Sequence, residues 1–247
     1  MSKISIVIPC YYNEKNIPIT TAALLENEKN FPSEVTFEYV FVDDGSGDGT
    51  VQELLFFKKL APERITIVKL AYNAGSYNAI YAGLEHATGD CVVVMAADLQ
   101  DPPEVIIEMY AEWKKGEKMV LANRVANLNW SAKAFHWILR IFCLPSLPQG
   151  GFDYCLFDNE VKQGLLAKIQ PNINSLYLLL TLGYPHKTIP YQKRKREIGS
   201  SKWTFRKKLK LTLSTLFYFA SVKSVVMAYF WRNQAQGKQP FVIDEIL

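Results

Sequence analysis

Residues 39–60 read YVFVDDGSGDGTVQELLFFKKL and place an apolar run, a polar turn and a helical pattern in direct succession. The apolar residues at 39–42 are typical of a short strand that is buried on both faces of a parallel sheet. Residues 50–60 have the spacing of an amphipathic helix. The stretch therefore predicts a β-strand followed by an α-helix, which is the repeating unit of α/β proteins.

The same unit recurs on both sides of this stretch, because short apolar runs alternate with helical patterns through the first half of the chain. We predict an α/β fold with a Rossmann-like, mainly parallel sheet flanked by helices. Asp48 and Ser76 are the expected N-caps of two helices. The expected strands are 4–9, 39–42, 65–70, 91–96 and 119–122, and the expected helices are 17–29, 50–60, 77–87 and 104–115.

The pattern changes after residue 124. We predict a helix at 130–142, a short strand at 153–157, and helices at 159–168 and 173–182. An apolar stretch at 211–231 is long enough to cross a bilayer, yet Lys223 interrupts it and favours an amphipathic helix on a membrane or on the protein body. We divide the chain into a domain at 1–192 and a basic, amphipathic C-terminal segment at 193–247.

Composition excludes several classes of protein. The chain has 247 residues, 49% of them hydrophobic and 21% charged, so neither a disordered nor a fibrous protein is expected. Its four cysteines lie far apart without zinc spacing and are expected to be buried thiols in a reducing compartment. The first residues enter a strand pattern without the features of a signal peptide, which favours the cytoplasm.

Positive charge is concentrated in one segment. Residues 193–210 carry nine Lys and Arg against one Glu, whereas the whole chain has a net charge of +4. Such a run suits phosphate on a substrate, an anionic membrane or a nucleic acid, or it forms a solvated surface. Nucleic acid is the weakest of these interpretations, because no recognised motif accompanies the charge and residues 1–192 are acidic.

Polar clusters follow four of the predicted strands, at residues 9–14, 43–49, 73–75 and 97–103. In a parallel sheet these positions share one edge, where ligands of open α/β sheets bind. Neither a dinucleotide glycine motif nor a P-loop is present. Carboxylates that hold Mg²⁺ or Mn²⁺ would provide another way to bind phosphate, and Asp98, Gln100 and Asp101 offer suitable oxygens.

Three motifs, SIVIPCYYNE (5–14), FVDDGSGDGT (41–50) and ADLQDPPE (97–104), resemble the donor half of inverting family 2 glycosyltransferases with the GT-A fold. Two later motifs, GGFDYCLFDNEV (150–161) and KREIGSSKWTFRKKLK (195–210), resemble the polyprenyl-phosphate branch of this family, which includes dolichol-phosphate mannosyltransferases. The resemblance covers nearly the whole chain. It implies a nucleotide-sugar donor and a Mg²⁺ or Mn²⁺ cofactor.

The resemblance also implies residue roles. Asp43 or Asp44 would accept a hydrogen bond from the base, and Asp98 and Gln100 would hold the metal. Asp98 is alternatively a helix N-cap, and Asp101 is expected to cap that helix rather than bind metal. Arg124, or the pair Arg194 and Arg196, would face a phosphate. The other implied residues of the nucleotide site are Pro9, Tyr11, Asn13, Glu14, Asn73, Gly75 and Ala97.

On the acceptor side, Asp153 takes the position of a proposed general base, or it is an ordinary aspartate at a strand edge. Lys202 would lie near the acceptor or donor phosphate. Residues 193–222 would dock on an anionic membrane, away from the donor site, through the basic run and the aromatic side chains Trp203, Phe205, Phe217, Tyr218 and Phe219. Aromatic residues at this spacing are alternatively part of the core.

Three features depart from the family pattern. Ala96 stands where the family has the first aspartate of Asp-Ala-Asp, which weakens the expected metal or ribose contacts. Cys155 stands where the branch often has an arginine for the acceptor phosphate. Many members continue into transmembrane helices, whereas this sequence stops soon after Arg232, so we expect a lipid reached from the membrane surface or a soluble acceptor.

Together these observations predict an inverting, metal-dependent glycosyltransferase. Its donor would be a nucleoside diphosphate sugar, UDP-sugar first and GDP- or dTDP-sugar next, and its acceptor a polyprenyl phosphate or a lipid-linked glycan. The alternative is a non-catalytic nucleotide-sugar-binding protein in which Ala96 marks a degraded metal site. The expected location is the cytoplasmic face of a membrane in cell-envelope polysaccharide synthesis. A homo-oligomer is compatible with the sequence, and no nucleic-acid partner is expected.

Overall fold

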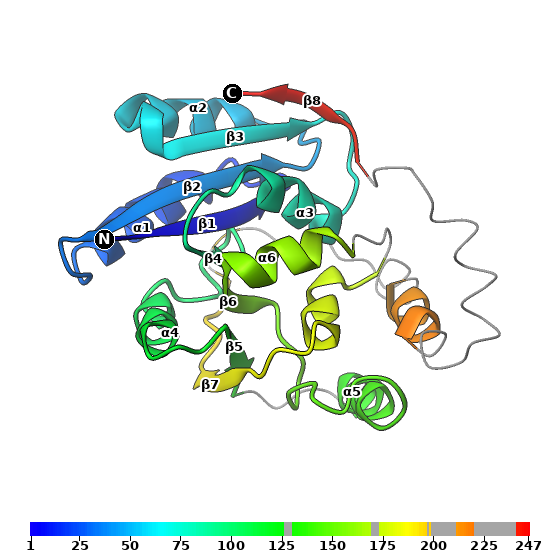
Figure 1. Ribbon diagram of the computed structural model, residues 1–247. Helices are drawn as coiled ribbons and strands as arrows, with labels where there is room; N and C mark the ends of the chain where they lie inside the picture. Colours follow the sequence, from blue (N-terminus) through cyan, green and yellow to red (C-terminus); the bar gives the residue numbers. More distant parts are fainter. Residues whose placement is uncertain (126–129, 169–172, 197, 199–210, 220–240) are drawn as a thin grey trace.

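The computed structural model describes residues 1–125, 130–168, 173–196, 198, 211–219 and 241–247. These residues form a mixed eight-stranded sheet with helices on both faces (Figure 1). The α/β class predicted from the sequence is therefore confirmed.

The elements follow one another in the predicted alternation through the first half of the chain. In order they are β1 (Ser2–Cys10), α1 (Ile17–Glu28), β2 (Val35–Asp43), α2 (Thr50–Leu60), η1 (Pro62–Arg64), β3 (Ile65–Leu70), α3 (Ser76–His86), β4 (Cys91–Val94), α4 (Val105–Lys114), β5 (Met119–Arg124), α5 (Trp130–Phe142), β6 (Tyr154–Asp158), α6 (Asn159–Leu166), η2 (Ser175–Thr181), β7 (Lys187–Tyr191) and β8 (Ile243–Ile246). Residues 211–219 are also helical.

The strand order is β7-β5-β6-β4-β1-β2-β3-β8. β1 pairs in parallel with both β2 and β4, and β2 pairs in parallel with β3, so the carboxyl ends of these four strands share one edge. The chain moves outward from β1 to β3 and then returns to the other side of β1 at β4. This reversal makes the crevice between β1 and β4 the expected ligand position in an open sheet.

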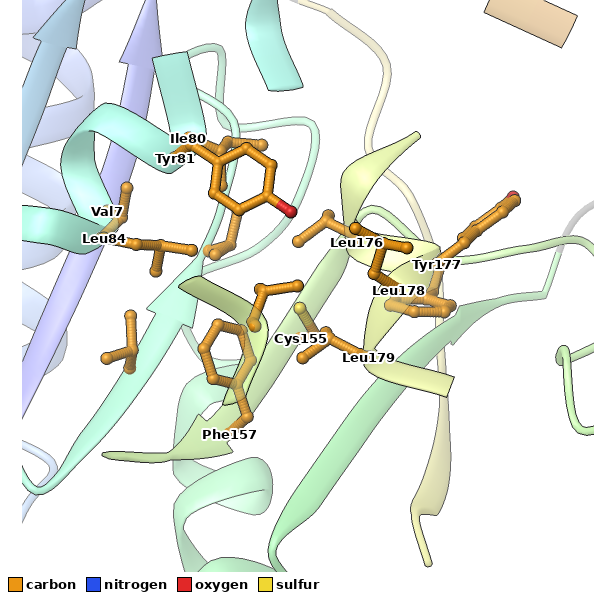
Figure 2. Packing of buried hydrophobic residues seen from close by; sticks show 14 of the residues in the cluster. Val7, Ile80, Tyr81, Leu84, Cys155, Phe157, Leu176, Tyr177, Leu178 and Leu179 are labelled. Carbon is orange, nitrogen blue, oxygen red and sulfur yellow. The ribbon is translucent and has the colours of Figure 1, made fainter. Parts of the chain in front are cut away.

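Alternating side chains of the strands build two hydrophobic clusters, one on each face of the sheet. Val7, Val40 and Val42 face a cluster that includes residues of α3, α6 and η2. Figure 2 shows part of this cluster, in which side chains of β1, α3, β6 and η2 lie together. Ile6 and Phe41 face the second cluster, which includes residues of α1, α2 and α4.

Several elements differ from the sequence prediction. The 3₁₀ helix η1 was not predicted, and β2 begins at Val35 rather than at residue 39. The helix expected at 173–182 is the 3₁₀ helix η2, in which consecutive leucines are buried and give no helical period. β7 was not predicted because it contains Pro190, which an edge strand tolerates. β8 was not predicted because its residues, Asp244 and Glu245 among them, are largely exposed at the other edge.

The helix starts at α2 and α3 also differ from expectation. Their N-cap residues are Gly49 and Gly75 rather than Asp48 and Ser76. Asp48 Oδ1 nevertheless accepts hydrogen bonds from the Thr50 N–H at 3.2 Å and the Thr50 hydroxyl at 2.5 Å. Asp48 therefore stabilises the first turn of α2 from the position directly before the N-cap.

Gly83 of α3 allows the helix to lie directly on the sheet. A Cβ atom there would lie 2.5 Å from Val7 Cγ1 and 2.9 Å from Val42 Cγ2. We predict that Gly83→Ala lowers the free energy of unfolding by about 1 to 2 kcal/mol, because overpacking exceeds the gain in helix propensity. Urea unfolding measures the change.

Gly164 of α6 provides the matched control, because a Cβ atom there would make ordinary contacts of 3.5 and 3.6 Å with Leu182. Gly164→Ala should raise the free energy of unfolding by up to about 1 kcal/mol. A Gly83→Ala protein as stable as the Gly164→Ala protein would contradict the close packing of α3 on β1 and β2.

Candidate functional site

A cleft of about 630 Å³ opens where β1, β2, β3 and β4 end. The loops after these four strands line it, together with the start of α3 and residues from later in the chain. The lining includes ten of the residues expected in the site, which are Pro9, Tyr11, Asn13, Glu14, Asp44, Asn73, Gly75, Ala97, Asp98 and Arg196. The polar clusters at the strand ends therefore meet at one place.

Asp44, the first residue after β2, holds the loop after β3. The residue is only 3% exposed. Its Oδ1 accepts the Ala74 N–H at 2.6 Å, and its Oδ2 accepts the Gly75 N–H at 3.0 Å and the Asn73 side-chain amide at 2.8 Å. One carboxylate thus satisfies donors just before α3 and fixes the wall of the cleft.

Close backbone contact between the same two loops requires Gly45. Its φ is 69°, and a Cβ atom there would lie 2.7 Å from the Asn73 nitrogen. The Asp-Gly turn of the sequence is therefore more than a connection between β2 and α2, because it lets the two loops touch.

Asp43 differs from its neighbour. It is fully buried and is not among the residues that line the cleft. Its Oδ2 accepts the Ser46 N–H at 3.2 Å, while its Oδ1 has no hydrogen-bond partner among the described residues. Burial raises the pKa of the Asp43 carboxyl, although the hydrogen bonds from Ser46 act in the opposite direction. Asp44 is therefore the better placed of the two to meet a ligand.

The loop after β1 is tied to the loop after β2. The Asn13 N–H donates to Thr50 Oγ1 at 2.8 Å, and Glu14 Oε2 accepts the Gly49 N–H at 3.2 Å. Tyr12 has a φ of 54°, which is uncommon for a residue with a side chain, and it presents its ring at the cleft with 43% exposure. These contacts order the loop from both sides.

Asp98, just after β4, is engaged at both carboxylate oxygens. Oδ2 forms an ion pair with Nη2 of Arg196 at 2.6 Å, and Oδ1 accepts the Gln100 N–H at 3.2 Å. The side chain of Asp98 is 10% exposed and that of Arg196 is 27% exposed. The alternative role for Asp98 as a helix N-cap is wrong, because Glu104 is the N-cap of α4.

The residues present fit a divalent metal poorly. Mg²⁺ and Mn²⁺ bind oxygen ligands, commonly one or two carboxylates with water and phosphate. Ala96 offers no ligand, Asp98 is paired with Arg196, and the Gln100 amide nitrogen lies 3.5 Å from the Arg194 carbonyl. Within the part of the chain that the structure describes, no group of three His, Cys, Asp or Glu side chains is arranged to hold a metal.

The segment 191–196 lies along the loop after β4. The Arg194 N–H donates to the Gln100 carbonyl at 2.8 Å, and the Arg194 guanidinium pairs with exposed Glu104 rather than pointing into the cleft. Asp101 does not cap α4 as expected. It is 1% exposed, accepts the Tyr191 hydroxyl at 2.6 Å and pairs with Lys193 at 3.2 Å.

Asp153 lies outside the cleft lining and contacts it through Tyr77 of α3. Arg124 Nη2 lies 2.9 Å from Asp153 Oδ2, and the Tyr77 hydroxyl donates to Oδ1 at 3.1 Å. Burial raises the pKa of Tyr77 well above its ordinary value, and the charge of Asp153 adds to this, so the hydroxyl keeps its proton. The Asp153 side chain is 43% exposed and open to a ligand.

Sequence reasoning missed several residues of the cleft, among them Tyr77, Ile173, Ile198 and Leu211. The signal for Tyr77 was its position in the first turn of the helix that follows Asn73. For the other three no signal was present, because they reach the cleft only through the path of the chain after β6.

Within the described part of the C-terminal segment, Arg196, Ile198 and Leu211 line the cleft, so these residues do not lie away from the donor side as expected. In the helix 211–219, Phe219 is buried in the core while Phe217 is 51% exposed. None of the described helices is both long and apolar enough to span a bilayer. Lys202, Trp203, Phe205 and the basic residues Arg206, Lys207, Lys208 and Lys210 lie outside the described residues.

Comparisons with known proteins agree with the resemblance found in the sequence. The family described as glycosyl transferase family 2 matches residues 5–142. A bactoprenol glucosyl transferase of Shigella phage SfX is 31% identical over 235 residues, covering 92% of this chain and 75% of that protein. An uncharacterized glycosyltransferase of Synechocystis sp. is 30% identical over 233 residues, covering 92% of this chain and 72% of that protein.

Among solved structures, the chain resembles the mannosyltransferase PcManGT from Pyrobaculum calidifontis in complex with GDP-Man and Mn²⁺. The TM-score is 0.57 at 17% identity, and the match covers 94% of this chain and 79% of the other. The likeness shows the fold, and the GT-A architecture predicted from the sequence is confirmed.

We predict different effects on stability for replacing Asp44 and its neighbour Asp43. Asp44→Asn should lower the free energy of unfolding by about 1.5 to 3 kcal/mol, because an amide N–H₂ group would face the donors of residues 73–75 in place of a charged acceptor. Urea unfolding at neutral pH measures the loss.

Asp43→Asn is the control and should be tolerated, with a dependence on pH. The pKa of Asp43 is raised in the folded protein, so the stability of the wild type falls as the pH rises through that value. The variant lacks this titrating group, so the free energy of unfolding of the variant should rise relative to that of the wild type as the pH rises. An equal loss of stability for the two variants at every pH would contradict the assignment.

Proposed function

The chain belongs to glycosyltransferase family 2, and we propose that it moves a sugar from a nucleoside diphosphate donor to a polyprenyl phosphate, with inversion at the anomeric carbon. The observation that carries the proposal is the pair of arginine sites at the cleft. Arg196 lies inside it, and Arg124 lies beside it next to Asp153. Each offers a guanidinium to a phosphate, one for the donor and one for the acceptor. A UDP-sugar is the first donor to test.

The donor would lie across the carboxyl ends of β1, β2 and β4. Asp44 would accept an N–H of the base, since a carboxylate suits the imide N–H of uracil or the amide N–H of guanine. Tyr11 and Tyr12 line the cleft and contact each other edge to face at 4.7 Å between ring centroids. They would give the base an apolar surface. The diphosphate would then extend toward Arg196.

Transfer with inversion needs an oxygen nucleophile that attacks the anomeric carbon from the side opposite the nucleotide. The new bond joins this oxygen to the anomeric carbon, and the electron pair of the broken bond leaves with the diphosphate. An acceptor phosphate is already ionised and needs no base to remove a proton. A hydroxyl acceptor would need one, with a rate contribution of about 10² to 10⁴.

The surroundings of Asp153 favour the phosphate acceptor. Arg124 and Tyr77 each donate to one of its oxygens, so both oxygens of the carboxylate already take part in a hydrogen bond. This arrangement suits a residue that positions Arg124 better than one that removes a proton. The related bactoprenol glucosyl transferases are named for a polyprenol, which also favours a lipid phosphate. A lipid-linked glycan with a hydroxyl nucleophile is the second candidate.

A thermal-shift panel with UDP, GDP, dTDP and CMP tests the donor class, because a ligand at 100 times its Kd adds about 2.7 kcal/mol of stability. Transfer is then followed by mass spectrometry of a polyprenyl phosphate incubated with the corresponding nucleotide sugars. Turnover also separates this proposal from a non-catalytic nucleotide-sugar-binding protein, the alternative to which Ala96 points.

We predict that Asp153→Asn lowers kcat less than about tenfold with a polyprenyl phosphate acceptor, because no proton has to be removed. Tyr77→Phe, which removes one hydrogen bond to the same carboxylate, is the matched variant and should have a smaller effect. A loss of about 10² to 10⁴ for Asp153→Asn, with a pH profile that loses its acidic limb, would identify a general base and a hydroxyl acceptor instead.

We also propose that the protein docks on the cytoplasmic face of a membrane. α5 exposes Trp137 and Ile141, and the helix 211–219 exposes Leu213 and Phe217. Both helices pack other residues on the same hydrophobic cluster, so their exposed apolar side chains belong to one side of the fold. The basic residues between 199 and 210 precede the second helix in the chain and would meet anionic headgroups.

We predict that the protein binds vesicles with anionic lipid and leaves neutral ones, and that binding falls with salt, because charges are screened over about 8 Å at physiological ionic strength. Changing Arg206, Lys207, Lys208 and Lys210 together to glutamine should abolish binding. The matched control changes four exposed lysines to glutamine in or directly after α1, α2 and α4, which cover the other face of the sheet. These lysines are Lys29, Lys59, Lys114 and Lys115. Equal losses in a vesicle flotation assay would contradict docking through the C-terminal segment.

A further inference from the structure

We propose that the Arg196 guanidinium supplies the positive charge for the donor's diphosphate in this chain, so that the nucleotide binds without a divalent metal. This inference rests on the proposed donor class and concerns the same cleft. It replaces the Mg²⁺ or Mn²⁺ expected from the sequence with a residue of the chain itself.

The first observation is the position of the guanidinium. Arg196 Nη2 lies 2.6 Å from Asp98 Oδ2, and Asp98 is the carboxylate expected to hold the metal. A divalent ion at Asp98 would have to break this partly buried ion pair. A guanidinium also carries N–H donors on Nη1 and Nε, which a phosphate can accept in the bidentate geometry that arginine favours.

The second observation is that Arg196 is held in place by the segment before it. Lys193 pairs with buried Asp101, Arg194 pairs with Glu104, and the Arg194 N–H donates to the Gln100 carbonyl. These contacts fasten residues 193–194 to the loop after β4, two residues before Arg196. A cation positioned before the ligand arrives loses less conformational freedom on binding than a mobile side chain does.

The third observation concerns the charges of the cleft. The described lining residues include the carboxylates of Glu14, Asp44, Asp48 and Asp98, and two cations, Lys15 and Arg196. Lys15 is exposed, whereas Arg196 is partly buried. Electrostatic attraction to a phosphate is stronger for the less solvated cation. Arg196 is therefore the protein group best placed to neutralise a diphosphate inside the cleft.

The fourth observation is Ala96, which lines the cleft two residues before Asp98 and brings no charge. One carboxylate beside one guanidinium is electrically balanced. A second carboxylate at position 96 would leave an excess negative charge, which favours a divalent ion over arginine. The absence of that carboxylate and the presence of the ion pair thus point to the same arrangement.

The test is calorimetric titration of UDP and GDP into the purified chain, once with EDTA and once with Mn²⁺. We expect the Kd of the better nucleotide to differ by less than about threefold between the two buffers. Arg196→Gln should weaken binding by about 10- to 100-fold in EDTA, because it removes a hydrogen bond to a charged group. Lys195→Gln is the matched control, since it removes one exposed charge next to Arg196, and its Kd should stay unchanged.

A gain-of-metal variant strengthens the test. Ala96→Asp combined with Arg196→Gln supplies the second carboxylate and removes the competing cation, so its nucleotide binding should become dependent on Mn²⁺. Far-ultraviolet circular dichroism of each variant establishes that it is folded. Unlike an assay of transfer, both titrations report on binding alone.

The outcomes separate this inference from the proposed function. Binding of a nucleotide by the wild type only in Mn²⁺, with tighter metal-dependent binding in Arg196→Gln, would overturn the role of Arg196 and leave the nucleotide-sugar donor standing. Failure to bind any nucleotide in either buffer would overturn both. Binding in EDTA that is lost in Arg196→Gln and kept in Lys195→Gln supports both.

Discussion

The hydrogen bonds that Asp44 accepts from residues 73–75 are the interaction on which the cleft depends. They join the end of β2 to the start of α3, and they do so with a carboxylate that is almost completely buried. A loop that carries several backbone N–H groups near a helix start must find acceptors for them. Asp44 meets this need, and in doing so it holds the loop that forms one wall of the cleft. The strand order then determines what else can reach the cleft.

Most of the fold was predictable from the sequence because its inner strands contain apolar runs and the loops that follow them are polar. The helices at 17–29, 50–60 and 104–115 begin and end within one residue of the structure, and the polar clusters gather at one edge as expected. β7 and β8 were not predictable, since edge strands lack the two-sided burial that makes the inner strands recognisable. The path of residues 192–196 follows from β7, so the contact of Arg196 with Asp98 could not be predicted either.

The carboxylates expected to take part in the chemistry share a feature that motifs do not reveal. Asp98 and Asp153 each form an ion pair with an arginine from a distant part of the sequence. A motif identifies which carboxylates stand at a site, but their partners depend on tertiary structure. Arg194 and Arg196 illustrate this point, because one points to Glu104 on the surface and the other into the cleft although they are two residues apart. The balance of charge in the cleft is therefore a property of the fold.

The two outer strands of the sheet limit how copies of the chain can associate. An edge strand exposes unpaired backbone groups that can capture another strand, with aggregation as the result. At one edge, β7 carries Pro190, which cannot donate a hydrogen bond, and exposed Lys187. At the other edge, β8 carries the acidic residues Asp244 and Glu245, which would repel the same strand of a second copy. Growth of the sheet from chain to chain is therefore disfavoured at both edges.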